Sequence, residues 1–187
     1  EKQTPILLPA GSGRARAERI DLSAAPASGY QSRPPDRPAE APADLHAYVA
    51  WVAAVSPEAS PGSFPTAESR LAYWINAYNA LAMYNAIRSG IPESLGKMKF
   101  RFFYRDRLVL GGERISLYAL ENGIIRPLGD PRIHFALNCM VRGCPRLPRV
   151  PFEAASLDEQ LDSAARLFFD EERNVTLDPA AKVVRFN

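Results

Sequence analysis

The chain has 187 residues, of which 47% are hydrophobic and 24% are charged, so it is long enough to form one domain with a hydrophobic core. Its 23 basic and 21 acidic residues are mixed along the sequence, which argues against the one-sided basic surface of a nucleic-acid-binding protein. No apolar run reaches the roughly 20 residues that a membrane-spanning helix needs. We therefore expect one soluble domain that neither spans a membrane nor binds nucleic acid.

The first part of the chain differs in composition from the rest. Residues 1–43 contain seven prolines and no sustained hydrophobic period, which is typical of an irregular segment. We expect an irregular, proline-rich arm over residues 1–43 and a single folded domain over residues 44–187. The chain begins at Glu1 rather than at a methionine, so we interpret it as a processed or trimmed form and expect an exported protein, periplasmic or extracellular.

Two helices are expected at the start of the domain. Asp44 is placed to cap the first helix, which ends before Pro57. Its apolar stripe consists of Leu45, Tyr48, Val49, Val52 and Val55. The second helix opens near Thr66 and runs to Gly90. Apolar and aromatic residues surround this longer helix on nearly every side, so we expect it to lie in the centre of the fold.

Short strands are expected next, over residues 99–104, 107–110 and 113–115, with Gly111-Gly112 as a two-residue hairpin turn. Basic and aromatic residues alternate in the first of them. We interpret this alternation as a half-buried strand rather than as a surface on which nucleic-acid bases stack. Ser116 is expected to cap a short helix over residues 117–125, which Pro127 ends.

The last third of the chain predicts a strand, a helix and a hairpin. The strand covers residues 133–137 and carries His134. The run Ser156-Leu-Asp-Glu159 is a capping box that opens a helix extending to about Arg173, and the hairpin pairs residues 175–177 with 183–186. This order of elements predicts an α+β fold, in which a central buried helix and flanking helices pack on an antiparallel sheet.

Reactive side chains concentrate in one short segment that holds His134, Cys139 and Cys144. On a regular strand, His134 shares a face with Asn138, and Cys139 points to the opposite face. Cys144 follows the flexible Gly143 and can fold back toward the imidazole. A His within hydrogen-bonding distance favours the thiolate and creates a nucleophile. The first hypothesis is therefore a thiol-dependent hydrolase or acyl transferase, similar to a cysteine protease, that acts on a peptide or a small molecule.

Such a site also needs a group that orients the imidazole and a donor to the developing oxyanion. Glu121 is the candidate for the first role, with Asn76, Asn79 and Asn138 as alternatives. Asn76 and Asn79 are candidates for the second role, and they share a face of the central helix. The alternative interpretation of these two amides is that they bond to loop backbone and fix the core.

Two further hypotheses remain open. In one, the domain is a non-catalytic interaction or scaffold module in which a disulfide closes the loop between Cys139 and Cys144. In the other, the two cysteines form the redox pair of a thiol protein. Zinc has suitable ligand types in this segment, but the spacing matches no common zinc pattern, so we expect no metal and no cofactor.

Three blocks of the sequence resemble the family called domain of unknown function 547. The blocks are residues 72–81, 120–126 and 130–139, the last followed by Gly143-Cys-Pro145. The resemblance covers roughly residues 45–186 and implies no established reaction, although family members occur in plants and, often as exported proteins, in bacteria. The positions that match the family blocks are Asn76, Asn79, Glu121, Arg126, His134, Cys139 and Cys144.

The resemblance bears on the cysteines and also has limits. Because both cysteines are motif positions, it favours a disulfide or a paired redox role. The family commonly has a Glu-His-Gly-like run in the second block, whereas in this sequence Asn122 follows Glu121. The sequence also stops at Asn187, near the place where a closing aromatic stretch is expected. A weaker likeness, of a central helix followed by a sheet with a His-bearing strand, is to the papain and transglutaminase plan. In that plan a cysteine lies at the start of the central helix, and the central helix expected here contains no cysteine.

Overall fold

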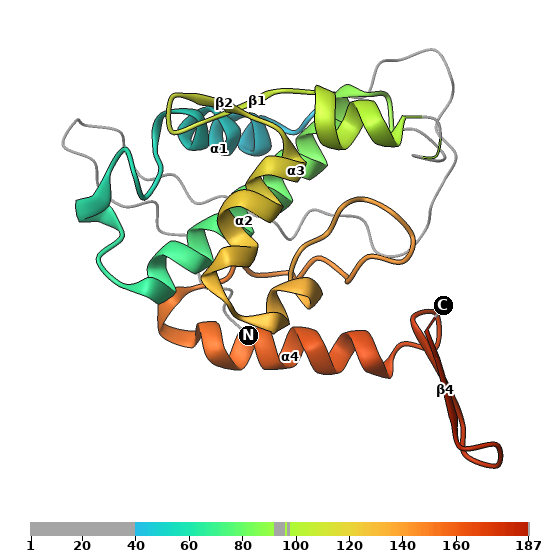
Figure 1. Cartoon of the computed structure of the whole chain (residues 1–187). Helices are drawn as coiled ribbons and strands as arrows, with labels where there is room; N and C mark the ends of the chain where they lie inside the picture. The colour runs from blue at the N-terminus through green and yellow to red at the C-terminus, as the bar shows by residue number, and fades with distance from the viewer. Residues whose placement is uncertain (1–39, 92–95, 97, 187) are drawn as a thin grey trace.

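The computed structural model describes residues 40–91, 96 and 98–186. The predicted irregular arm therefore lies almost entirely outside the described residues. The remaining chain folds around helix α2, with α1 and hairpin β1–β2 on one side and α4 on the other (Figure 1). The fold is α+β, as predicted. Among the described residues, no helix is both long enough and apolar enough to cross a membrane.

Helix α2, Ala67–Arg88, is the central element. Its start is the predicted one: the Thr66 side chain accepts from the Ser69 N–H, and the Ser69 side chain accepts from the Thr66 N–H. Most of its side chains are buried, including Trp74, Ile75 and Leu81. The prediction of a helix that is apolar on nearly every side is confirmed, and this helix supplies much of the hydrophobic core.

Helix α1, Ala43–Ala54, begins two residues earlier than predicted, and its N-cap is Pro42 rather than Asp44. Strands β1, Leu108–Leu110, and β2, Glu113–Ile115, form the predicted hairpin. Its turn closes the end of α1, because the N–H of Gly111 donates to Val52 O at 2.9 Å and that of Gly112 donates to Ala53 O at 2.7 Å. The turn thus satisfies two helix carbonyls that have no partner within the helix.

The segment predicted as a strand over residues 99–104 is helical, so that prediction is wrong. It includes a π-helical stretch, Arg101–Arg105. A strand would place Phe100, Phe102 and Tyr104 on the same face. Instead Phe102 is fully buried, whereas Phe100 and Tyr104 are exposed. Here only one side of a helix contacts the apolar core. In so short a segment, the alternation of residue types fits such a helix as well as a strand.

Helix α3, Leu117–Ala119, continues into a π-helical stretch, Leu120–Ile125, and a 3-10 turn, Arg126–Leu128. The predicted cap is confirmed, since the Ser116 hydroxyl accepts from the Ala119 N–H. This continuous helical run packs on α2 and carries Glu121 and Arg126 toward the site described below.

The strand predicted over residues 133–137 is also wrong. Residues Pro131–Phe135 form a 3-10 helix, with Asp130 as the N-cap that accepts from the Arg132 N–H at 2.8 Å. Ile133, Ala136 and Leu137 are buried. Their spacings of three and four residues fit a helical turn, whereas a strand would place Ile133 and Ala136 on opposite faces. His134 therefore lies on a short turn and not in a sheet.

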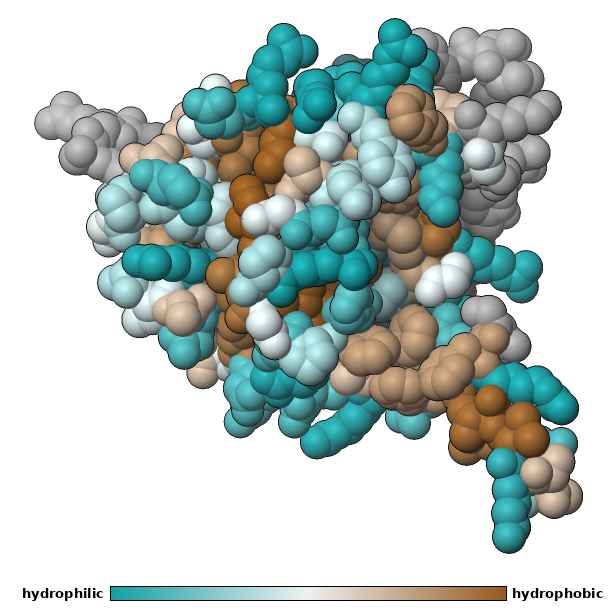
Figure 2. All heavy atoms as spheres, viewed as in Figure 1, coloured by the Kyte–Doolittle hydropathy of each residue, from teal (hydrophilic) through white to brown (hydrophobic). Residues whose placement is uncertain are grey.

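Helix α4, Leu157–Asp170, is amphipathic and ends three residues before the predicted limit. The predicted capping box is absent, because the Ser156 side chain makes no capping hydrogen bond. Strands β3, Val175–Asp178, and β4, Val183–Phe186, form the predicted final hairpin. In the described residues the strands therefore make two separate two-stranded antiparallel sheets rather than one. The β3–β4 hairpin projects from the body and exposes apolar side chains (Figures 1 and 2).

Candidate functional site

A hollow of about 400 Å³ lies between α2, the helical run after Ser116 and the loop that follows His134. Its walls are mostly apolar, with a few polar groups, which is typical of a site for a small ligand. It is lined by Tyr78, Glu121, Arg126, His134, Phe135, Leu137, Cys139, Val141, Gly143, Cys144, Pro145 and Phe168. The structure therefore brings together the predicted residues Glu121, Arg126, His134, Cys139 and Cys144.

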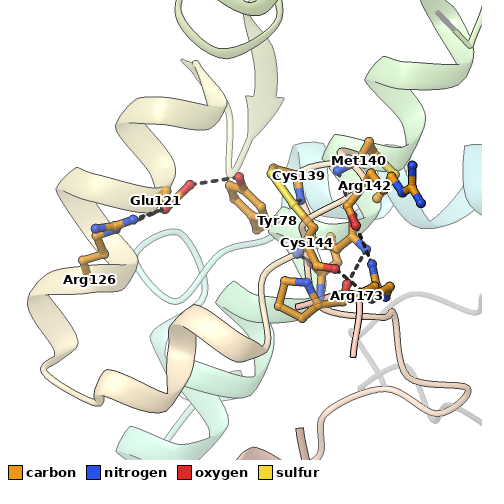
Figure 3. The surroundings of a disulfide bond; sticks show 11 residues. Tyr78, Glu121, Arg126, Cys139, Met140, Arg142, Cys144 and Arg173 are labelled. Carbon is orange, nitrogen blue, oxygen red and sulfur yellow. Dashed lines mark hydrogen bonds and ion pairs between the residues drawn. A yellow bond between two sulfur atoms is a disulfide. The ribbon is translucent and has the colours of Figure 1, made fainter. Parts of the chain in front are cut away.

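One wall contains a chain of three hydrogen-bonded side chains. The Tyr78 hydroxyl donates to Glu121 Oε2 at 2.9 Å, and Arg126 donates to Glu121 Oε1 from Nη2 at 2.6 Å and from Nε at 3.1 Å. Burial, the Glu121 charge and this hydrogen bond all raise the pKa of Tyr78 above its ordinary value. The phenol therefore stays protonated and acts as a fixed donor (Figure 3).

The lining also contains a disulfide between Cys139 and Cys144, whose Cα atoms are 6.2 Å apart (Figure 3). Cys144 is buried and Cys139 is half-buried. The Cys139 N–H also donates to Cys144 Sγ at 3.1 Å. In this state neither sulfur is a thiolate, so neither acts as a nucleophile or a metal ligand. Among the described residues, no group of three or more His, Cys, Asp and Glu side chains is placed to hold a metal ion.

The disulfide loop is held from inside by Asn138. Its Oδ1 accepts from the Met140 N–H at 2.7 Å, and its Nδ2 donates to Pro145 O at 2.6 Å. The side chain therefore joins the two ends of the loop. Met140, at φ 62, is in the left-handed region, and its hydrogen bond to Asn138 helps to hold this strained backbone.

The two central-helix amides bond to loop backbone, as the second interpretation of them predicted. Asn79 donates to Ala136 O at 2.9 Å and accepts from the Asn138 N–H at 2.8 Å. Asn76 makes the same pair of bonds with the N–H and C=O of Phe152. Neither lines the hollow, so the structure gives them a role in positioning loops, and the oxyanion role receives no support from this geometry.

A clamp formed by Arg173 and Glu171 holds the disulfide loop from outside. Arg173 donates to the carbonyl oxygens of Arg142 and Cys144, and Glu171 pairs with both Arg173 and Arg146. Burial opposes ionisation of Glu171, but the hydrogen bonds from the two guanidinium groups outweigh it and lower the pKa of the carboxyl. Sequence reasoning missed this clamp, because its partners are separated by about thirty residues and follow no local motif.

His134 is exposed at the rim of the hollow. Within the described part of the chain it makes no hydrogen bond or ion pair, so the predicted contacts with Glu121 and with a cysteine thiol are not formed. The inference that Cys139 points away from His134 is wrong, because it assumed a strand. Both residues line the same hollow.

The turn that carries His134 is anchored to α4 through Arg132. This guanidinium donates to Asp130 and Asp158 at 2.8 Å and to Asp162 at 2.6 Å. The hydrogen bonds from Arg132 lower the pKa of Asp130, and the three carboxylates raise the pKa of Arg132. The backbone around His134 is therefore fixed while its side chain stays accessible.

Sequence reasoning also missed Tyr78 and the aromatic residues Phe135 and Phe168 in the lining. A signal for Tyr78 existed: it lies in the buried face of the central helix, and a buried tyrosine hydroxyl usually finds a hydrogen-bond partner. Phe168 gave no such signal, because its place in the wall depends on how α4 packs against the 3-10 turn.

A family model described as "Protein of unknown function, DUF547" matches residues 63–169. The chain belongs to the DUF547 family. The match covers α2, Glu121, Arg126, His134 and both cysteines, and it is shorter at both ends than the predicted resemblance. Searches of the curated proteins and of the solved structures found no match. The papain-like plan therefore has no structural neighbour to support it, and its His-bearing strand is replaced by a 3-10 turn.

Proposed function

We propose that this DUF547 domain binds a small molecule or a short peptide that carries an anionic group, and that the hollow beside the disulfide is its binding site. The observation that carries the proposal is the convergence on one hollow of six residues from the three sequence blocks: Tyr78, Glu121, Arg126, His134, Cys139 and Cys144. A cavity of about 400 Å³ has the size of a site for a small ligand.

The available polar groups set the charge of the ligand. Both carboxylate oxygens of Glu121 already accept hydrogen bonds. Nη1 of Arg126 has no acceptor among the described residues, and neither does the imidazole of His134. The Arg126 guanidinium and an N–H of the His134 imidazole are thus donors left to meet a ligand, which favours a carboxylate or another anion. The apolar lining, which includes Phe135 and Phe168, is suited to the apolar body of such a ligand.

The test uses the whole chain, with its disulfide intact, and a panel of N-acetyl amino acids with apolar side chains, each as the free acid and as the amide. Calorimetry is expected to detect binding of acids and weaker binding of the matched amides. Replacing His134 with Leu, which has no donor, should weaken acid binding about ten-fold, the effect of one charge-assisted hydrogen bond.

His46→Leu is the matched control, because His46 is also exposed but does not line the hollow. It should leave the affinity unchanged. Equal affinities for acids and amides, equal effects of the two His replacements, or no binding by any member of the panel would contradict the proposal.

A thiol-dependent activity is the second candidate, and the hydrogen bond from the Cys139 N–H to Cys144 Sγ favours it. An external thiolate can attack the more accessible Sγ of Cys139. The Cys139–Cys144 bond then breaks, a mixed disulfide forms on Cys139, and Cys144 leaves as a thiolate that the N–H stabilises. A second thiolate that attacks the external sulfur of the mixed disulfide releases Cys139 as a thiolate and completes the reduction. Hydrolysis or acyl transfer with His134 as the base would require this reduced, dithiol form. We also propose export, since a disulfide persists in oxidising compartments.

Iodoacetamide labelling at neutral pH tests this candidate, before and after treatment with a dithiol reductant. The oxidised protein should not react, because it has no free thiol. After reduction, at least one cysteine should react faster than a cysteine in the same chain unfolded by urea. If neither does, the activated-thiol role is wrong, and the disulfide serves only to brace the loop.

A further inference from the structure

Three aromatic rings form an exposed stack on the surface beside α3. Phe100 and Tyr104 stack with ring centroids 5.5 Å apart, and Tyr104 stacks on Tyr118 at 4.6 Å. Their exposed fractions are 70% for Phe100, 41% for Tyr104 and 46% for Tyr118. The stack joins the helical segment that includes Arg101–Arg105 to α3, and these elements are in contact (Figure 1). Large apolar rings gathered on a surface in this way commonly mark an interaction site.

Positive charge surrounds the stack. Residues 98–107 contain four cationic side chains and one carboxylate, Asp106. That carboxylate is largely buried and is already bonded to Arg101 and Asn85. Lys99 and Arg105 are exposed, adjoin the rings in sequence, and make no ion pair within the described part of the chain. The surface therefore offers cations that are free to meet an anionic partner.

We propose that this aromatic–basic patch, formed by Lys99, Phe100, Tyr104, Arg105 and Tyr118, binds the headgroup region of an anionic lipid bilayer. Cations attract anionic headgroups, and aromatic side chains enter the interface between headgroups and acyl chains. Burial of apolar surface there needs no particular ring orientation, so rings that already stack on one another can still enter.

The stacking itself argues against single-stranded nucleic acid as the partner. A base binds by lying on a free aromatic face. Here the rings stack on one another, Tyr104 with both Phe100 and Tyr118, so they do not offer successive bases a separate platform each. The even mixture of acidic and basic residues along the whole chain likewise lacks the extended basic groove that follows a nucleic-acid backbone.

The experiment is flotation of the full chain with vesicles of phosphatidylcholine alone and with vesicles of equal parts phosphatidylcholine and phosphatidylglycerol. Binding is expected to the second kind only and should weaken as salt is raised. Phe100→Ala should lower the partition coefficient about ten-fold, as expected for one aromatic side chain. Lys99→Gln combined with Arg105→Gln should lower it by roughly 25-fold, at about five-fold for each charge.

Two matched controls lie elsewhere on the surface. Phe186 is 69% exposed, close to the value for Phe100, and the Arg166 side chain is 78% exposed. Phe186→Ala and Arg166→Gln should leave the partition coefficient unchanged. The proposal is overturned if these controls reduce binding as much as the patch variants do. It is also overturned if neither kind of vesicle is bound, or if the patch variants abolish binding to an oligothymidine and leave vesicle binding unchanged.

Discussion

Replacing Asn79 with Ala is expected to lower the free energy of unfolding by about 3 kcal/mol, because it leaves two backbone groups, one buried and one partly buried, without partners. Asn79 is 6% exposed and bonds to Ala136 O and to the N–H of Asn138. Asn138 in turn joins both ends of the disulfide loop. The loss should therefore reach the candidate site, and the chemical shifts of residues 136–145 should change in the folded variant.

Asn122→Ala is the matched control for this measurement. Asn122 is half-buried, and its single hydrogen bond goes to Tyr118 O within the same helical run. Loss of this hydrogen bond should lower the free energy of unfolding by less than about 1 kcal/mol, since the exposed groups that are freed can bond to water. Urea unfolding followed by circular dichroism gives both values. Equal costs for the two replacements would show that Asn79 does not connect α2 to the site.

The elements that the sequence predicted correctly are those defined by local chemistry. The Thr66 cap and the surrounding apolar residues predicted α2, and Gly111-Gly112 predicted the first hairpin. In each case the deciding interactions lie within a few residues of one another. The final hairpin was predicted for the same reason.

The two wrong strands share one cause. In a short segment, alternating apolar residues fit a strand and also fit a tight helix that buries every fourth residue. Burial of Ala136 together with Ile133 and Leu137 shows that the helical pattern holds around His134, because Ile133 and Ala136 would point to opposite faces of a strand. Asp130-Pro131 carried the information needed for a correct prediction, because Asp is a preferred N-cap and Pro is favoured in the first turn of a helix.

Part of the lining of the hollow could be predicted from the sequence, but the hydrogen bonds that connect its residues could not. The blocks around Glu121, His134 and the cysteines pointed to one location, and these residues do line one hollow. Their pairing depends on contacts across long stretches of chain, such as Tyr78 with Glu121 and Arg173 with the Cys144 carbonyl. No sequence spacing encodes such contacts, so Glu121 was expected to orient His134 when its partners are Tyr78 and Arg126.

Gly111→Ala is expected to destabilise the fold by about 3 kcal/mol, for two separable reasons. Gly111 has φ +56, in the left-handed region, where a residue with a side chain is less stable than glycine by roughly 1 kcal/mol. In addition, an added Cβ would lie 2.6 Å from Ser56 Cβ and closer still to its Oγ. Ser56 is 3% exposed, so it has little room to move. Gly112 is the control: at φ +88 with open space around it, Gly112→Ala should cost only about 1 kcal/mol.

A double-mutant cycle with Ser56→Gly separates strain from steric overlap. Ser56→Gly removes the two atoms that the new methyl group would meet, at the cost of the bond from the Ala59 N–H to Ser56 Oγ. In that background, Gly111→Ala should cost only the conformational strain of about 1 kcal/mol, so the cycle should give a coupling energy of about 2 kcal/mol. A coupling energy near zero would mean that the turn moves away from Ser56 freely. The bonds from Gly111 and Gly112 to the end of α1 would then not hold the hairpin in place.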